Sequence, residues 1–207
     1  MNKLLILTTT LLFISCSPFK DMPESSEQEL KSNYNSKHKE IAKLKRYFNS
    51  ITPKDLEIYI EFINDQTIDL SIYHKTIPPY PKKVLFQQWG FNPYNGRQDS
   101  PVYNMPDDET SSLDTVKDIL NWKDATFRTI KAYLDNANCI SVTNGEPANV
   151  GFRRSGMGMY FYNLFNAPLN DSLKKTYNDS CRYRLYNDTM AFEYGGGAIG
   201  PQCFPDK

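Results

Sequence analysis

Two glycine-rich segments hold residues whose types and spacing could bind an anion. The first, 149–158, carries Arg153 and Arg154 shortly before Gly156 and Gly158. Glycines permit positive φ angles, so backbone N–H groups can converge on an anion, and a nearby arginine would strengthen the site. In a strand the two arginines alternate between faces, so only one of them could enter such a site.

The second glycine-rich segment, 193–203, begins with Glu193 and Tyr194, which we take with the two arginines as candidate ligand contacts. Neither segment has the lysine and serine or threonine that end a P-loop, and the glycine spacing is not a nucleotide fingerprint. The alternative is that the glycines form β-bulges and a tight closing turn, with Cys203 fixing the end. The sequence leaves both interpretations open.

A stretch rich in proline and aromatic residues runs from Lys75 to Asp108, with a short edge strand predicted at 84–89. A long irregular segment inside a compact domain is uncommon unless it binds something or is disordered. Aromatic rings held between prolines can form a recognition surface, which makes Trp89 and Tyr94 candidate ligand contacts. The alternative is a loop that covers the core with these rings.

Residues for catalysis or metal binding are few. His38 lies between two lysines on a predicted helix and should be at the surface, while His74 ends a strand without a cysteine or carboxylate cluster nearby. A serine hydrolase would have to combine His74 with Ser155, but the glycine that a nucleophile elbow needs two residues before the serine is missing. We therefore predict no catalytic residue, no metal site and no cofactor.

Two stretches with apolar residues at helical spacing should form the packing helices. The first runs from Gln28 to Phe48, and Pro53 prevents it from continuing. The second carries its apolar residues from Leu113 to Leu134 and can be capped by Ser111 or Ser112. We expect each to be one continuous helix.

The strands are predicted between and after these helices. Alternation over 56–62 and 68–73 predicts a β-hairpin with a solvated outer face of Glu57, Glu61 and Asp69 beside Tyr59 and Tyr73. The alternative is that this face binds something cationic. Further strands are predicted at 140–143, 150–153, 160–165, 182–186 and 190–194. This order predicts an α+β fold, a two-layer domain with two main helices packed on a largely antiparallel sheet.

The first sixteen residues have the character of an export signal. A positive start and an apolar stretch from Leu4 to Ile14 precede Ser15 and Cys16. Residues 12–16 resemble the lipobox of bacterial lipoproteins, with Phe13 where leucine is usual. The resemblance implies that a signal peptide, 1–15, is removed, that Cys16 is lipidated, and that the lipid attaches the chain to a membrane.

The segment after Cys16 has no apolar period, so 16–27 is predicted to be a tether and 28–207 a single domain. The serine after Cys16 resembles lipoproteins sent to an outer membrane. The charged residues beyond it resemble the export tags of surface-displayed lipoproteins in Bacteroidota-type bacteria. These resemblances imply an outer membrane lipoprotein that faces the periplasm or the cell surface. No second apolar segment approaches the roughly 20 residues of a transmembrane helix.

Three cysteines follow the lipidated one, and an exported chain occupies a compartment where thiols oxidise. An odd number leaves one thiol over, so at most one intramolecular bridge can form. We favour Cys181 with Cys203, because a hairpin and a glycine run could bring them together. The alternative is that both of them and Cys139 are small buried apolar residues.

Charge and composition bound the function. Basic and acidic residues balance at 24 each, which argues against a nucleic-acid partner. The chain is similar to small uncharacterised lipoproteins of Bacteroidota-type bacteria. Our leading hypothesis is a lipid-anchored envelope protein that acts as a non-catalytic binding module for an envelope protein or small ligand. The alternatives are an envelope hydrolase with an unrecognised site and an immunity-type inhibitor of a secreted toxin.

Overall fold

The computed structural model describes residues 23–75, 81–95, 113–196 and 200–205. These residues form four helices and an eight-stranded antiparallel sheet, which confirms the predicted α+β class. The predicted signal peptide, Cys16, Ser111 and Ser112 lie outside the described residues, as do parts of the proline-rich stretch and of the second glycine segment.

Apart from a divided second helix and a short helix at 171–176, the elements follow the predicted order along the chain. They are α1 (Glu27–Ile51), β1 (Leu56–Phe62), β2 (Ile68–His74), β3 (Lys83–Phe91), α2 (Leu113–Leu120), α3 (Asp124–Ala137), β4 (Ser141–Thr143), β5 (Ala148–Ser155), β6 (Gly158–Leu164), α4 (Asp171–Thr176), β7 (Tyr183–Asn187) and β8 (Met190–Gly195). The strand order in the sheet is β3-β2-β1-β4-β5-β6-β8-β7.

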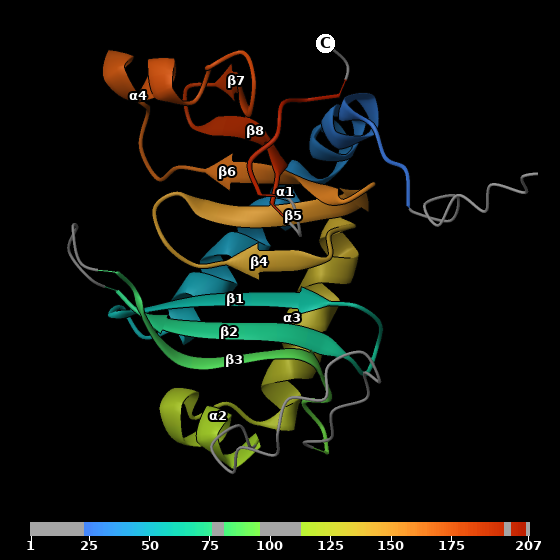
Figure 1. Cartoon of the computed structure of the whole chain (residues 1–207), viewed down its shortest axis with the longest axis vertical. Coiled ribbons are helices and arrows are strands. Elements are labelled where there is room, and N and C mark those ends of the chain that lie inside the picture. The colour runs from blue at the N-terminus through green and yellow to red at the C-terminus, as the bar shows by residue number, and fades with distance from the viewer. Residues whose placement is uncertain (1–22, 76–80, 96–112, 197–199, 206–207) are drawn as a thin grey trace, which may run out of the picture.

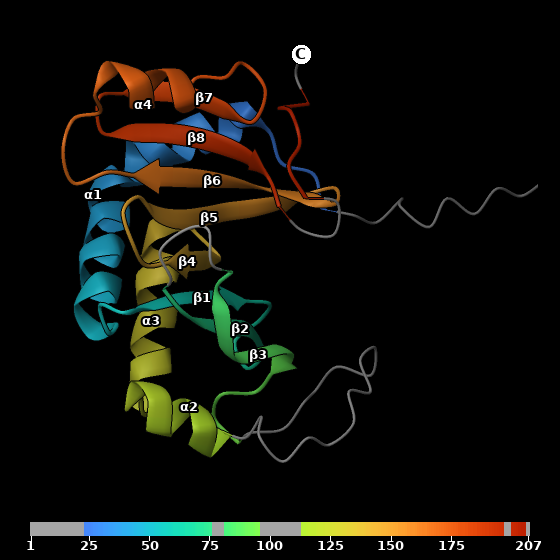
Figure 2. The same cartoon turned by 60° about the vertical axis from the view of Figure 1, so that its left-hand side comes forward.

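One face of the sheet lies toward α1 and α3, which run behind the strands in Figure 1 and to one side of them in Figure 2. The strand residues of this face are buried and apolar, and include Ile58, Ile60 and Val150. They join one hydrophobic cluster with helix residues such as Leu44 and Ile130. The opposite face carries polar residues, and we call it the polar face; it is defined by Glu61, Asp69, Asn163, Arg154 and Glu193.

α1 begins where Ser26 caps it. The Ser26 hydroxyl accepts a hydrogen bond from the Glu29 amide at 3.2 Å, and the Glu29 carboxylate accepts one from the Ser26 amide at 2.9 Å. This reciprocal pair satisfies two otherwise free N–H groups of the first turn. The pKa of Glu29 is lowered by the Ser25 hydroxyl and then by the Ser26 amide, which both donate to its carboxylate.

The second predicted helix is divided into two, so the prediction of one continuous helix is wrong. Asn121 adopts a left-handed conformation with φ 53°, and α3 begins only at Asp124. The break allows Trp122 to enter the core, where its indole N–H donates to the Ile51 carbonyl at 3.2 Å. In an unbroken helix Trp122 would lie off the apolar stripe of Leu120 and Phe127, because only residues three, four or seven apart share a face.

Cys181 and Cys203, which are 22 positions apart in the sequence, form the predicted disulfide. The adjacent Phe204 amide donates to the Cys181 carbonyl at 2.9 Å, and the Phe204 ring is buried against Tyr160 and Tyr194. Cys139 is the free, buried thiol of the described part of the chain. The disulfide therefore fixes the C-terminal segment to the start of β7.

We expect the Cys181→Ala/Cys203→Ala variant to lose about 3 kcal/mol of unfolding free energy, because the crosslink restricts the unfolded chain. Urea denaturation with and without a reductant measures this loss. The reductant should lower the stability of the wild type to that of the variant and leave the variant unchanged. A wild type that is indifferent to the reductant would contradict the crosslink.

Candidate functional site

The polar face is centred on an ion pair between β1 and β5. The Arg154 guanidinium donates to both carboxylate oxygens of Glu61, from Nε and Nη2, each at 2.7 Å. Glu61 also accepts a hydrogen bond from the Tyr59 hydroxyl. The Glu61 side chain is 1% exposed and that of Arg154 is 36% exposed. A carboxylate buried to this degree requires a charged partner, and the bidentate geometry supplies one.

The irregular register of β5 directs Arg154 to this face. The strand pairing shifts between Gly151 and Arg153, where β5 carries an additional residue relative to β6. Arg153 donates to the Asn138 side chain at the end of α3, at 3.1 Å, whereas Arg154 reaches Glu61. The two arginines thus point to different sides, as predicted from strand alternation.

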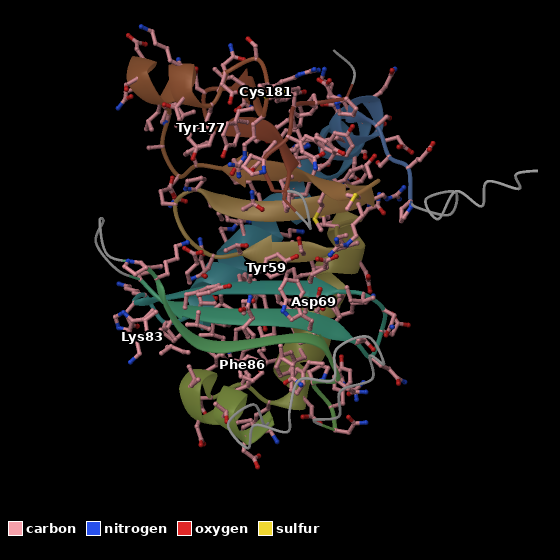
Figure 3. All side chains as sticks on the ribbon, viewed as in Figure 1. Tyr59, Asp69, Lys83, Phe86, Tyr177 and Cys181 are labelled. Atoms are coloured by element: carbon pink, nitrogen blue, oxygen red, sulfur yellow. A yellow bond between two sulfur atoms is a disulfide. The ribbon has the colours of Figure 1, made fainter. Side chains whose placement is uncertain are left out.

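Asp69 continues the cluster onto β2. Its side chain is buried and accepts a hydrogen bond from the Gly90 amide at 2.9 Å. Gly90 has φ 66° and lies where the β2–β3 register shifts, next to Trp89, which is 45% exposed. Figure 3 shows Asp69 and Tyr59 on the neighbouring strands β2 and β1.

The prediction of a solvated outer face of the β1–β2 hairpin is wrong at Glu61 and Asp69, whereas Glu57, Tyr59 and Tyr73 on the same face are partly exposed. Glu61 and Asp69 are both buried, as is Ser71. The physical reason is that Arg154 reaches Glu61 from a strand distant in sequence, while the Gly90 amide binds Asp69. Alternation within a hairpin cannot indicate what lies across its outer face.

Burial changes the acid-base behaviour of this cluster. The pKa of Asp69 is raised from its ordinary 3.8 by burial, although the Gly90 amide and Arg154 act in the opposite direction. The pKa of Tyr59 is raised strongly by burial and by the Glu61 charge, so its hydroxyl remains protonated and donates to Glu61. These shifts are what a closely packed set of charges in a low-dielectric site produces.

A second buried carboxylate, Glu193, lies on the same face. It is on β8, which lies between β6 and β7 in the sheet. It accepts hydrogen bonds from Arg182 Nε at 2.8 Å, from Asn163 at 2.8 Å and from Asn149 at 3.2 Å. Burial and the Glu193 charge raise the pKa of nearby Tyr183 to about 12. Glu193 is thus held by the protein's own donors.

The other predicted contacts lie apart from this face. The Tyr194 ring is buried near Phe204, and its hydroxyl donates to the Ser155 carbonyl at 3.0 Å. Tyr94 packs against the hydrophobic core, with the Arg128 guanidinium 4.5 Å from the centre of its ring. For Tyr94 the structure agrees with the alternative in which the proline-rich stretch covers the core.

The two glycine segments lie side by side but form turns in their described parts. Met159, which directly follows the first segment on β6, pairs with Gly195 of the second segment. Gly156 has φ 56° in the β5–β6 turn, and the Gly196 amide donates to the Gly200 carbonyl at 3.0 Å. These contacts match the alternative of bulges and a closing turn. Trp89 is separated from β5 by β2, β1 and β4.

His74 and Ser155 do not form a catalytic pair. His74 pairs with Leu56 at the start of β1, and its exposed ring lies 3.6 Å from exposed Asp55. The Ser155 hydroxyl instead donates to the Ser25 carbonyl at 2.8 Å and accepts from the Ser25 amide at 3.2 Å. Ser155 follows Arg154, which binds Glu61 on β1. Glu61 lies five residues along β1 from Leu56, the partner of His74, so roughly 17 Å of strand separates the two ends.

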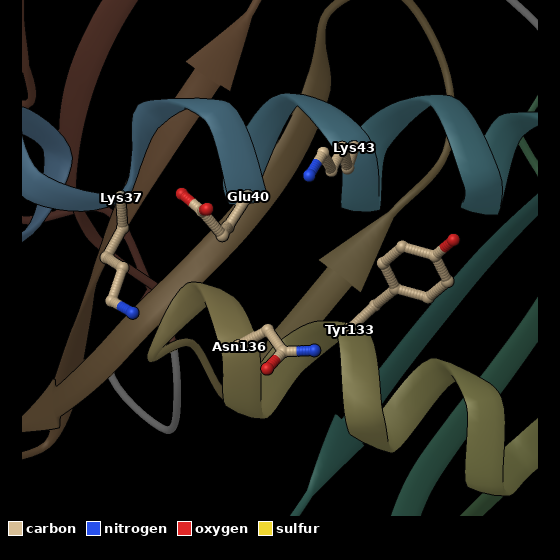
Figure 4. A pocket seen from close by; sticks show the side chains of 5 residues that line it. All are labelled: Lys37, Glu40, Lys43, Tyr133 and Asn136. Carbon is tan, nitrogen blue, oxygen red and sulfur yellow. The ribbon is translucent and has the colours of Figure 1, made fainter.

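A hollow of about 490 Å³ lies between α1 and α3, away from the polar face (Figure 4). It is lined by Lys37, Glu40, Lys43, Tyr133 and Asn136. The Tyr133 ring stacks on Tyr47 with their centres 4.5 Å apart. Sequence patterns do not predict this hollow, because its residues lie on two helices that only the fold brings together.

Comparison with known proteins adds no relative. No family model, no curated protein and no solved structure matches the chain. In the part of the chain that the structure describes, no helix is long and apolar enough to cross a membrane. The same residues contain no cluster of histidine, cysteine and carboxylate groups that could hold a metal ion.

We expect Arg154→Met to lower the free energy of unfolding by about 3–5 kcal/mol, because it leaves Glu61 buried without a charged partner. The Arg154→Met/Glu61→Leu variant should recover most of this loss, because both charges are then absent. Arg46→Met, which removes an exposed arginine of α1, is the control and should change stability little. Equal losses in the single and double variants would show that the two groups are not coupled.

Asp69→Asn should become more stable relative to the wild type as pH rises from 4 to 7. The folded state holds the Asp69 proton more tightly than the unfolded state, since its pKa lies above 3.8. Ionisation above that pH therefore costs the wild type stability, and asparagine avoids this cost while keeping an acceptor for Gly90. Urea denaturation at both pH values measures the difference; a relative gain by the wild type would contradict a raised pKa.

Proposed function

We propose that the chain is a lipid-anchored envelope protein whose folded domain is a non-catalytic binding module. The polar face is its binding surface, with Arg154 as the main contact, and exposed Trp89 on the edge strand β3 extends this surface. The partner is an envelope protein or a small ligand of the envelope. The sequence supports the location through the lipobox that ends at Cys16, and the arrangement of the polar face supports the binding role.

The observation that carries the binding role is how Arg154 is held. Glu61 engages Nε and Nη2, while Nη1 makes no hydrogen bond to any described residue. The guanidinium is thus fixed in orientation by a buried carboxylate, and within the described part of the chain its Nη1 donor is left for a partner. A side chain already held in its binding conformation loses little entropy on association. Arginine and tryptophan are also the residues that contribute most often to binding energy.

The positions of the described residues support the hydrolase alternative less well than the binding role. The serine and histidine that it would need lie at opposite ends of the strands, and the Ser155 hydroxyl is engaged by Ser25. Among the described carboxylates, Glu61 and Glu193 are both bound to arginines. These positions favour a binding role over catalysis.

The proposal includes the two-layer arrangement expected from the sequence. α1 and α3 would form one layer and the sheet the other, leaving the polar face for a partner. The contacts of α1 with β4, β5 and β6, and of α1 with α3, support this arrangement. So does the position of both helices behind the strands in Figure 1.

Affinity capture from the detergent-solubilised envelope of the native host tests the binding role. We expect the full-length wild type to retain a defined partner that the Trp89→Ala/Arg154→Lys variant loses. Lysine keeps a charge beside Glu61 but removes the fixed guanidinium fork. Leu173→Ala/Lys43→Ala, which changes an exposed leucine of α4 and a lysine between α1 and α3, is the matched control. Equal capture by all three folded proteins would contradict the proposed surface.

A further inference from the structure

The four residues before α1 are bound to the tip of the β5–β6 hairpin. The Gly156 amide donates to the Pro23 carbonyl at 2.9 Å. The Ser155 hydroxyl donates to the Ser25 carbonyl at 2.8 Å and accepts from the Ser25 amide at 3.2 Å. Residues 23–26, which we call the strap, were expected to belong to the tether. The described part of the chain therefore begins at the hairpin tip.

The strap limits how far the hairpin can lie from Cys16. Only seven peptide steps separate Cys16 from Pro23. Even a fully extended chain of that length spans at most about 25 Å. By comparison, eight strands side by side cover roughly 34 Å across the sheet. If Cys16 carries the lipid, the hairpin tip must stay within reach of the bilayer surface.

The same end of the strands presents exposed apolar side chains. β1 and β5 run in the same direction, because each pairs antiparallel with β4 between them. Their outgoing turns contain Ile63, which is 50% exposed, and Met157, which is 37% exposed. Exposed apolar side chains on turns at the same end of a sheet can enter the interface between water and lipid. Trp89 lies toward this end too, since β3 runs in the same direction as β1.

We propose that this end of the domain, defined by the strap, Ile63 and Met157, rests on the surface of a phospholipid bilayer. The inference depends on the proposed lipid anchor at Cys16. It adds an orientation of the domain on the bilayer, in which the β1–β2 and β5–β6 turns face the lipid. The polar face, with Arg154 near the β5–β6 turn, then meets its partner close to the membrane surface.

Site-specific fluorescence on vesicles tests the orientation. Full-length acylated protein, purified in detergent from a bacterial host, carries an environment-sensitive nitrobenzoxadiazole label at Met157→Cys. It is reconstituted into phosphatidylcholine vesicles with and without doxyl-labelled lipid. Val84→Cys is the matched control, because Val84 is 51% exposed and pairs with Tyr73 near the opposite end of the strands.

We expect the label at residue 157 to shift to shorter wavelength and to be quenched by doxyl lipid, while the label at residue 84 stays water-exposed and unquenched. Adding Ser155→Ala, which removes the strap's side-chain anchor, should reduce the quenching at residue 157. Equal quenching at both positions, or stronger quenching at residue 84, would overturn the orientation.

Intact mass and vesicle flotation distinguish the two proposals. An acylated, vesicle-bound protein with an unquenched label at residue 157 would leave the lipid anchor standing and refute the orientation. A protein without acyl mass that does not float with vesicles would refute the anchor, and the orientation with it.

Discussion

The bidentate pair between Glu61 and Arg154 is the interaction on which the polar face depends. A carboxylate with almost no exposure to water is unfavourable unless a charge and several donors compensate it. Arg154 provides the charge, and the Tyr59 hydroxyl adds a donor. The pair joins β1 to β5 across the three-residue strand β4. Because a buried ion pair is weak evidence for net stability, we regard it as a device that fixes one side chain in one orientation.

A second pair repeats this arrangement farther along the sheet. Arg182 holds Glu193, and two asparagines complete the hydrogen bonding of its carboxylate. Both arginines keep about a third of their side chains exposed while their partners are buried. The polar face is thus lined by guanidinium groups whose positions are set from below by carboxylates. This pattern suits recognition of an acceptor-rich partner better than it suits proton transfer, in which the acid or base must itself be accessible.

Much of the fold could be predicted from local patterns. Period-two alternation located the strands, and helical spacing located α1, because each pattern reflects the burial of one side of an element against the core. The disulfide was predictable from the hairpin and the glycine run that lie between Cys181 and Cys203. The break at Asn121 was not, because it arises from burial of Trp122 beneath the Ile51 carbonyl, a contact 71 residues away in sequence. Local periodicity contains no information about such a partner.

The candidate site was predicted only in part, because local patterns do not indicate partners that are distant in sequence. Arg154, Glu193 and Trp89 were identified by their types, but Glu61 and Asp69 were expected on a solvated face. Arg154 and Glu61 are 93 residues apart, and the register shift in β5 that brings them together has no clear signature besides Gly151. A β carbon on Gly151 would lie 2.0 Å from the Ser141 hydroxyl, so glycine is required there. Close backbone approach is visible in the fold and not in the sequence.

The central claim is that Arg154 is held rigidly by Glu61 and so is prepared to bind. Nuclear magnetic resonance of the arginine side chains measures this most directly. The account predicts a slowly exchanging Nε–H signal from Arg154, with a nuclear Overhauser effect to the Tyr59 ring, that is lost in Glu61→Gln. An Arg154 signal that exchanges with water as fast as that of exposed Arg46 in the folded wild type would contradict it.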